Sequence, residues 1–340
     1  MSKKIVITGA SGFVGANLTR RLIALGHDIY LLLRPDCKTW RLNDVLSHVG
    51  TRFTQLQDIE SLYITLNDIK PDWIFHLACH GAYSWQTDWR EMVETNLLGS
   101  INLMECASKI GVGAFVNSGC FSEYGSSPGA TPESQSLDPK NYYALTKSAQ
   151  TMTACKPFTN KMYLPTLRLY SVYGPWQAPQ DLIPNLIMYG LKNVLPPNLE
   201  SVSSDWHRTL NHLKDYVYID DVIDAYISAA QQPAGRDLSP IYNVGTGKQT
   251  STKMLVDLSI KEFDLNVRNK IASFKNGDSY EHEDDTSFVS AMANITKIRK
   301  SLDWYPSIEL EVGFKKFATW FRENPDIVEL YKSKLSQTCP

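Results

Sequence analysis

Short apolar runs alternate with longer stretches whose apolar residues recur every three or four positions along the first half of the chain. Residues 3–26, "KKIVITGASGFVGANLTRRLIALG", contain a β-branched run, a glycine-rich turn and an amphipathic helix, and "HDIYLLLRP" at 27–35 follows as a second strand. Further strands are expected at 52–59, 71–79 and 113–119, and helices at 88–111 and 141–157. This alternation predicts an α/β fold with a parallel sheet.

The pattern changes beyond about residue 165. The stretches "TLRLYSVYGP" (166–175) and "DYVYIDDV" (215–222) are typical of strands, but polar and proline-containing segments separate them. We therefore expect a smaller C-terminal substrate lobe that is interleaved with the first domain. The predicted division assigns residues 1–170 and about 214–246 to the first domain, and residues 171–213 and 247–340 to the smaller lobe.

Composition and charge narrow the class of protein. The 340 residues carry a net charge of −2 and the 34 lysines and arginines are scattered, so neither nucleic acid nor an anionic membrane is expected as a partner. No apolar run is long enough to span a bilayer. The six cysteines form no C-x-x-C pair and the chain opens directly on a strand, so we expect reduced thiols, no metal site and a cytoplasmic protein.

A glycine-rich turn joins the first strand to the first helix. In "TGASGFVG", Gly9 permits a tight turn, Gly12 lets the backbone approach a pyrophosphate, and Gly15 lets the helix pack closely on the strand. The helix N-terminus then offers N–H groups to the phosphates. Because the turn follows a strand, opens a helix and begins a βαβ unit, it predicts a doubly wound, Rossmann-type sheet that binds a dinucleotide.

The residue after the second strand bears on which dinucleotide binds. An acidic residue there accepts hydrogen bonds from the adenosine ribose and repels a 2′-phosphate, but this chain has Arg34. A guanidinium can bind that phosphate through two hydrogen bonds, so NADP(H) is expected in preference to NAD(H); an arginine that only lies on the surface is the alternative. Asp58, expected at the end of the third strand, is a candidate acceptor for the adenine amino group or a cap for the next helix.

The stretch "NYYALTKSA" places Tyr143 and Lys147 four positions apart on one face of a predicted helix, which on its own is typical of a solvated helix edge. With the glycine turn, however, this pair makes the chain resemble the extended short-chain dehydrogenases/reductases that modify nucleotide sugars. Further matching motifs run along nearly the whole chain: "HLAC" (76–79), "RLYSVYGP" (168–175), "DYVYIDDV" (215–222), "NVGTG" (243–247) and "LDWYP" (302–306).

The resemblance implies roles for individual residues. Tyr143 would exchange a proton with a sugar hydroxyl or ketone while hydride moves to or from nicotinamide, and Lys147 would hold the nicotinamide ribose. A phenol has a pKa of about 10, and a nearby ammonium and an oxidised nicotinamide would stabilise its phenolate. The resemblance also implies a nucleoside diphosphate sugar as ligand and a homodimer built on paired helices. Its further implied cofactor contacts are Ser11, Phe13, Ile59, Leu77, Ala78 and Asn96.

The third catalytic position of such proteins is a serine or threonine, and the corresponding residue in "NSGCFSEYG" is Cys120. A thiol donates a weaker hydrogen bond than a hydroxyl. Three alternatives stay open: Cys120 substitutes imperfectly, Ser118 or Ser122 supplies the hydroxyl, or Cys120 contacts the substrate through packing alone. Related 4,6-dehydratases place an acid just after this position, where this chain has Phe121 and Ser122. Glu123 comes one residue late, so dehydration is disfavoured.

Substrate contacts are expected beyond the carboxyl ends of the strands, where ligands bind in open α/β sheets. Lys214 replaces an arginine that relatives direct at the diphosphate, Ser171 stands where they often have an asparagine, and Asn185 is a further candidate. An aromatic segment at 80–89 is expected to line the sugar pocket, although aromatic clusters also fill cores. The expected sugar-facing residues are Tyr83, Ser84 and Trp85, and Ser122 is a further candidate substrate contact.

Three functions are consistent with these residues. The first is NADPH-dependent reduction of the 4-keto group of a nucleoside diphosphate 4-keto-6-deoxyhexose, as in synthases of the CDP-abequose and CDP-paratose type. Arg34 and the missing dehydratase acids favour it. The second is redox-neutral 4-epimerisation with retained NAD, which needs the same Tyr143 and Lys147. The third is a non-catalytic protein that senses nucleotides, and the retained pair argues against it.

Overall fold

The centre of the computed structural model is a seven-stranded sheet in which every paired strand runs parallel to its neighbour. The structure describes residues 2–83, 85–127, 129–155, 162–194, 212–232, 237–265 and 291–337. The strands lie in the order β3 (Gly50–Phe53), β2 (Asp28–Leu33), β1 (Lys4–Thr8), β4 (Trp73–His76), β5 (Ala114–Cys120), β7 (Thr166–Leu169) and β11 (Ile241–Val244). The strand order reverses beside β1, so the expected doubly wound α/β fold is confirmed.

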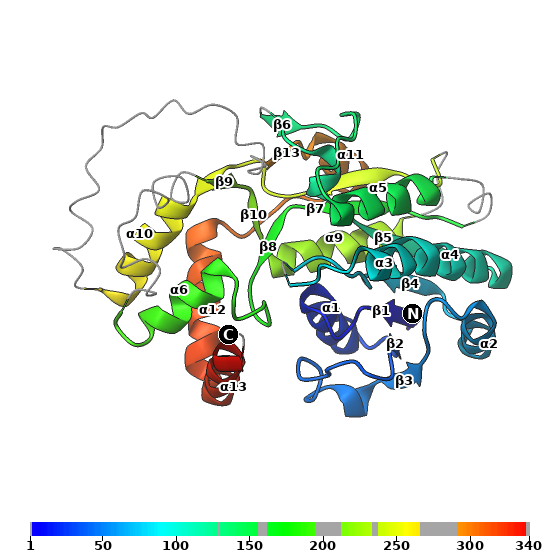
Figure 1. Cartoon of the computed structure of the whole chain (residues 1–340), viewed down its shortest axis with the longest axis horizontal. Coiled ribbons are helices and arrows are strands. Elements are labelled where there is room, and N and C mark those ends of the chain that lie inside the picture. Colours follow the sequence, from blue (N-terminus) through cyan, green and yellow to red (C-terminus); the bar gives the residue numbers. More distant parts are fainter. Residues whose placement is uncertain are drawn as a thin grey trace.

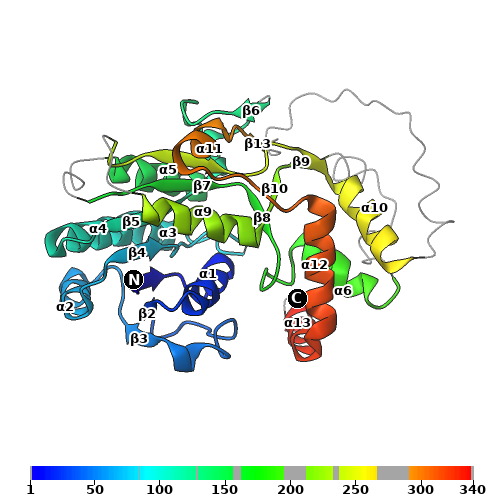
Figure 2. The same ribbon diagram turned by 180° about the vertical axis from the view of Figure 1, so that it is seen from behind.

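Helices cover both faces of this sheet (Figures 1 and 2). The side chains of β1 alternate between the two layers, because Ile5 and Ile7 join one core cluster and Val6 joins the other. The first cluster includes residues of α1 (Phe13–Ala24) and α9 (Ile219–Gln231), and the second includes residues of α2 (Ile59–Ile69), α4 (Gly99–Ile110) and α5 (Tyr142–Ala154). Strands buried on both faces explain the continuous apolar runs of the sequence.

A second group of helices lies beside one end of the sheet (Figure 1). It comprises α6 (Leu182–Gly190), α10 (Thr252–Phe263), α12 (Leu310–Glu323) and α13 (Pro325–Gln337). Three two-stranded pairs connect this lobe to the sheet domain: β8 (Ser171–Tyr173) with β10 (Tyr216–Tyr218), β9 (Leu213–Lys214) with β12 (Thr250–Ser251), and β6 (Ala130–Thr131) with β13 (Met292–Ala293). One late helix, α11 (Thr296–Leu302), packs on β11 and α9. The expected domain boundaries stay a prediction.

Two predicted strands are shorter in the structure. The third strand ends at Phe53, and Asp58 instead caps α2 by accepting a hydrogen bond from the Ser61 N–H at 3.0 Å. The stretch at 215–222 leaves the strand conformation at Tyr218, where α9 begins. Acidic residues in a first helical turn interact favourably with the helix dipole, which explains why this part of the motif is helical. Asp58 therefore lies at the start of a helix rather than at the end of a strand.

Aromatic side chains join the two lobes. Trp40, in the loop after β2, packs against Trp176 with ring centroids 6.1 Å apart and against Tyr331 of α13 at 5.8 Å. The neighbouring Arg41 donates from Nε to the carbonyl oxygen of Trp176 at 2.7 Å. These contacts fix the loop that follows β2 against the C-terminal helices. Within the described part of the chain, no helix combines the length and the apolar character needed to cross a membrane.

Candidate functional site

The glycine-rich turn between β1 and α1 is pressed against the segment that follows β4. Gly9 has a φ of +69°, and a Cβ on it would lie 2.5 Å from the backbone nitrogen of Ala78. A Cβ on Gly15 would lie 2.3 Å from the carbonyl oxygen of Gly9. The N-cap residue of α1 is Gly12, which makes no side-chain hydrogen bond to cap the helix. A tight turn that leads into an uncapped helix N-terminus fits the pyrophosphate of a dinucleotide.

Lys147 is buried on α5. It is 2% exposed, and its Nζ donates to the Ser118 carbonyl oxygen and to Gln150 Oε1, both at 2.6 Å. Gln150 is in turn oriented by Asn117, whose Oδ1 accepts from Gln150 Nε2 at 2.9 Å. The ammonium group therefore has neutral hydrogen-bond partners that keep it in place, and its charge stays available to a neighbouring group.

Tyr143 and Cys120 lie together at the carboxyl end of β5. Burial is the main cause that raises the pKa of Tyr143 well above its usual value, and the Cys120 side chain that hydrogen-bonds to it adds to this. Burial also raises the pKa of the Cys120 thiol. Ser122 Oγ donates to Cys120 Sγ at 3.0 Å. The structure thus brings together Tyr143, Cys120 and Ser122, and in the absence of a bound positive group the phenol stays protonated at neutral pH.

Ser118 is the other serine considered for the catalytic hydroxyl, but its hydroxyl forms hydrogen bonds with groups away from Tyr143. Its hydroxyl donates to the His76 carbonyl oxygen at 2.8 Å and lies 2.6 Å from the Tyr226 hydroxyl of α9. Only its carbonyl oxygen contacts Lys147. Ser118 therefore holds the ammonium through its main chain, and Cys120 and Ser122 are the groups beside the phenol.

Glu123 does not face the site. Its side chain is 0% exposed, and it accepts from the Cys120 N–H and from Arg168 Nε, each at 2.8 Å. Burial raises the pKa of this carboxyl, which Arg168 counteracts. The acid that follows Cys120 thus belongs to a buried ion pair, and this arrangement accords with the expectation that dehydration is disfavoured.

A polar network beneath the site was not anticipated from the sequence. Thr8 Oγ1 lies 2.7 Å from His76 Nδ1, and His76 Nε2 lies 2.7 Å from Ser100 Oγ. Burial, with a further effect of the Lys147 charge, lowers the pKa of His76 to about 3, so this histidine is neutral. The sequence did contain a sign of this network, because Thr8 and His76 are polar residues at the ends of the otherwise apolar strands β1 and β4.

Asn96, an expected cofactor contact, lies in a π-helical turn (Val93–Leu98) that runs into α4. Its side chain accepts from the His80 N–H at 2.7 Å and donates to the His80 carbonyl oxygen at 2.8 Å and to Thr146 Oγ1 at 3.0 Å. Asn96 therefore joins the segment after β4 to the helix that bears Tyr143. Single π-helical turns often occur at functional sites.

The expected substrate residues lie on the lobe side of the sheet. Lys214 of β9 is close to Asp181, which precedes α6, and burial lowers the Lys214 pKa while Asp181 opposes that shift. Asn185, one turn along α6, has a buried Oδ1 that finds no hydrogen-bond partner in the described part of the chain. Ser171 begins β8. A buried amide oxygen that has no partner among the described residues is suited to a polar ligand.

Tyr83 stacks on Trp85 with ring centroids 4.5 Å apart. Burial is the first cause that raises its pKa, and Arg41 and Asp181 are the charges that act on it next. Tyr83 therefore lies where the segment after β4 meets the second lobe. Ser84 lies outside the described residues.

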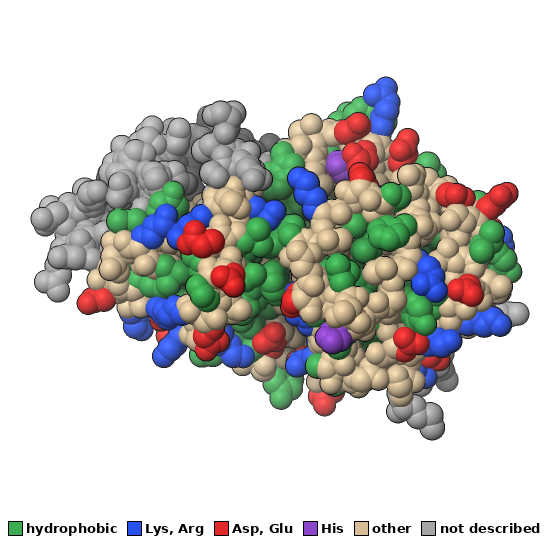
Figure 3. Space-filling model, turned by 90° about the horizontal axis from the view of Figure 1, so that it is seen from below, with side chains coloured by type: hydrophobic (Ala, Val, Ile, Leu, Met, Phe, Trp, Pro, Cys, Tyr) green, Lys and Arg blue, Asp and Glu red, His purple; other side chains and the backbone are tan. Residues whose placement is uncertain are grey.

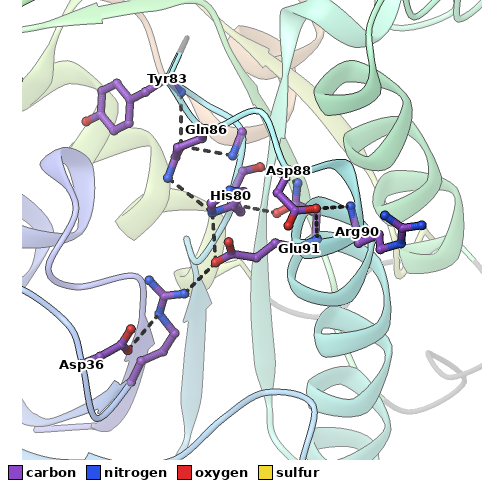
Figure 4. A network of polar contacts seen from close by, with 10 residues as sticks. Asp36, His80, Tyr83, Gln86, Asp88, Arg90 and Glu91 are labelled. Atoms are coloured by element: carbon purple, nitrogen blue, oxygen red, sulfur yellow. Dashed lines mark hydrogen bonds and ion pairs between the residues drawn. The ribbon is translucent and has the colours of Figure 1, made fainter. Parts of the chain in front are cut away.

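Arg34 has two acidic neighbours. Its Nη1 lies 3.0 Å from Glu91 Oε1 and its Nε lies 3.8 Å from Asp36 Oδ1 (Figure 4). The same Glu91 oxygen lies 3.2 Å from His80 Nδ1. Glu91 belongs to α3 (Trp89–Met92), 57 positions away in the sequence, so the sequence alone did not reveal it.

Other kinds of site find little support in the described residues. No group of three or more histidine, cysteine or acidic side chains there could hold a metal ion. On the face shown in Figure 3, acidic and basic side chains are interspersed and no patch of one sign covers the surface. The polar groups described above are therefore the best candidates for chemistry.

Known proteins resemble this chain over most of its length. Residues 5–245 match the model of the NAD dependent epimerase/dehydratase family. A UDP-glucose 4-epimerase of Mycolicibacterium smegmatis is 29% identical over 337 residues, which cover 94% of this chain and 98% of that protein.

Solved structures show the same fold. The UDP-glucose 4-epimerase of Thermotoga maritima, solved with UDP-glucose, superposes with a TM-score of 0.78 at 24% identity and covers 95% of this chain and 99% of its own. The Thermus thermophilus UDP-glucose 4-epimerase, solved with NAD, gives a TM-score of 0.76 at 22% identity, with 94% and 99% covered.

Proposed function

The chain belongs to the NAD dependent epimerase/dehydratase family, and on this premise we propose that it inverts the C4 hydroxyl of a nucleoside diphosphate sugar with NAD as its resident cofactor. UDP-hexoses and UDP-hexuronates are the substrates to test first, because relatives of similar length are named UDP-glucose and UDP-glucuronate 4-epimerases. These names favour the epimerase hypothesis over the reductase that Arg34 suggested.

The observation that carries the proposal is the setting of Tyr143. It lies beside Cys120 and on the same helix as Lys147, whose buried ammonium has neutral partners, while Glu123 is withdrawn into its ion pair with Arg168. Among the residues that the structure describes, such a site has one proton-exchanging group for the sugar and no second acid to expel a hydroxyl. It is suited to oxidation and reduction at a single carbon.

Tyr143, as phenolate, would accept the proton of the C4 hydroxyl and later return it to the same oxygen on the inverted sugar. When bound, nicotinamide supplies the hydride acceptor and donor for that carbon. Lys147 would stabilise the phenolate electrostatically and hold the nicotinamide ribose. Protons and hydride balance over the cycle, so no external reductant is consumed.

The remaining predicted contacts are part of the proposal. The turn with Gly9, Gly12 and Gly15 would hold the pyrophosphate and Asn96 would position the segment after β4. The other cofactor contacts proposed are Ser11, Phe13, Arg34, Asp58, Ile59, Leu77 and Ala78. The proposed substrate contacts are Lys214, Asn185 and Ser171 for the diphosphate, and Tyr83, Ser84 and Ser122 for the sugar.

A homodimer is also proposed. Leu98, Leu145 and Met152 are each about half exposed, at 48%, 52% and 58%, on the helical segments that lead into α4 and along α5. Exposed apolar side chains on neighbouring helices are typical of an interface. Light scattering after size exclusion should give twice the chain mass for the wild type and the monomer mass for Leu145→Glu.

One experiment separates the candidate reactions. The purified protein is incubated, without added cofactor, with UDP-glucose, UDP-galactose, UDP-glucuronate or UDP-galacturonate, and the C4 epimers are quantified by proton NMR. The bound nucleotide is released by denaturation and identified. We expect epimerisation of one pair and NAD as the bound nucleotide. NADPH oxidation with a UDP-4-keto-6-deoxyhexose, together with no epimerisation, would establish the reductase and overturn the proposal.

A further inference from the structure

The carboxylate of Glu91 lies against the guanidinium that follows β2. Arg34 Nη1 is 3.0 Å from Glu91 Oε1, and the Asp36 carboxylate lies 3.8 Å from Arg34 Nε. One positive charge therefore faces two negative charges, and the cluster carries a net negative charge. A 2′-phosphate directed at Arg34 would have to displace Glu91 from that donor.

The position of Glu91 does not depend on Arg34. Its backbone N–H donates to the N-cap residue of α3, Asp88, at 3.4 Å, and its Oε1 also lies 3.2 Å from His80 Nδ1. His80 is 12% exposed, and its main chain is fixed by both hydrogen bonds with Asn96. Figure 4 shows the Glu91 side chain reaching from the α3 segment past His80 toward the loop that holds Asp36. The contacts of Glu91 with Asp88 and His80 therefore hold its carboxylate beside Arg34 without help from Arg34 itself.

We propose that Glu91 determines the cofactor preference of this protein by occupying the donors of Arg34, so that the site selects NAD over NADP. The inference rests on the proposed NAD dependence. Sites that select NAD commonly have an acid at the end of the second strand, and one that binds a 2′-phosphate has an arginine nearby. This chain has the arginine at that place, and it receives the acid from a helix after β4.

Glu91 is a positioning residue in this account, because it acts through Arg34. A guanidinium binds a phosphate best through two parallel N–H donors. Because Glu91 Oε1 already lies 3.0 Å from Arg34 Nη1, one of these two donors is occupied before a cofactor binds. Glu91→Gln removes the carboxylate charge and keeps the size of the side chain. It should make both Arg34 donors available to a 2′-phosphate and leave the binding of NAD nearly unchanged.

The test is a competition for the protein. Wild type and Glu91→Gln are equilibrated with equal concentrations of NAD and NADP, freed of unbound nucleotide, denatured and analysed for the ratio of the two. We expect the NADP to NAD ratio to rise about tenfold in Glu91→Gln, which corresponds to about 1.4 kcal/mol. The matched control is Glu94→Gln, one turn along the same helical segment. The Glu94 side chain forms no ion pair with the residues that the structure describes, and the ratio should stay at the wild-type value.

A second variant shows whether the effect passes through Arg34. In an Arg34→Gln background, Glu91→Gln should change the ratio by less than about twofold. An unchanged ratio in Glu91→Gln, or an equal rise in both backgrounds, would overturn the inference. A wild type that prefers NADP would overturn the NAD part of the proposed function. The change from wild type to Glu91→Gln would still decide the role of Glu91.

Discussion

Two cations of the site are held in opposite ways. Lys147 is 2% exposed and is held by a carbonyl and an amide oxygen, whereas the Arg34 side chain is 54% exposed and lies between two carboxylates. A buried charge with neutral partners acts strongly on its neighbours, because little water screens it. An exposed ion pair contributes little to folding stability, but its charges can still bias which ligand binds beside it. The buried end is therefore suited to chemistry and the exposed end to selectivity.

The two ends also differ in how they are assembled. Tyr143 and Lys147 share one helix and lie beside β5, so most of the catalytic end comes from two adjoining elements. Arg34 follows β2, while Glu91 belongs to a helix that follows β4. Only the sheet, in which β1 lies between those two strands, brings them together.

The largest effect is expected at the catalytic end. Tyr143→Phe removes the proton-exchanging group, so turnover should fall by roughly 10³-fold or more. Binding of the nucleotide sugar, measured by calorimetry, should change little because the ring is retained. If Tyr143→Phe kept most of its turnover, another group would have to carry out the proton transfer.

The second-largest loss of turnover is expected for Lys147→Met. Burial raises the pKa of Tyr143, and turnover needs the phenolate, so the rate should increase with pH. A neighbouring cation typically lowers such a pKa by about 1–3, so its loss should slow turnover near pH 7 by roughly a hundredfold. The acidic limb of the pH–rate profile should move to higher pH. A uniform loss at every pH would mean that Lys147 acts on binding alone.

A smaller effect is expected at Cys120, beside the phenol. If the thiol substitutes for a hydroxyl, Cys120→Ser should raise kcat/KM by about fivefold, because a hydroxyl donates a hydrogen bond stronger by about 1 kcal/mol. Steady-state kinetics of Cys120→Ser, Cys120→Ala and Ser122→Ala would decide among the alternatives. A greater loss in Ser122→Ala than in Cys120→Ala would assign the hydroxyl to Ser122.

The smallest effect is expected at the exposed end. Asp36 is 79% exposed and lies 3.8 Å from Arg34, so its charge is well screened. Asp36→Asn should raise the bound NADP to NAD ratio by about twofold, less than Glu91→Gln. The same competition measurement checks this. A larger change for Asp36 than for Glu91 would reverse the order of the two carboxylates.

Much of the sheet domain was predictable because its elements are local. The apolar runs marked β1, β2, β4 and β5, and the glycine turn marked the start of α1. The third strand was overestimated, because the polar residues after Phe53 lie in a loop and Asp58 is used as a helix cap. The start of α9 was missed because its apolar positions also suit a buried strand.

Sequence alone was sufficient to predict the α/β class, the tight glycine-rich turn and the spacing of Tyr143 and Lys147, because each depends on residues close together in the chain. The tertiary structure alone decided which charges meet. It paired Glu123 with Arg168, buried His76 against Lys147, and placed Glu91 against Arg34. Coulomb interactions depend on distance and on burial, and neither quantity can be obtained from sequence spacing when the groups lie on different strands and helices.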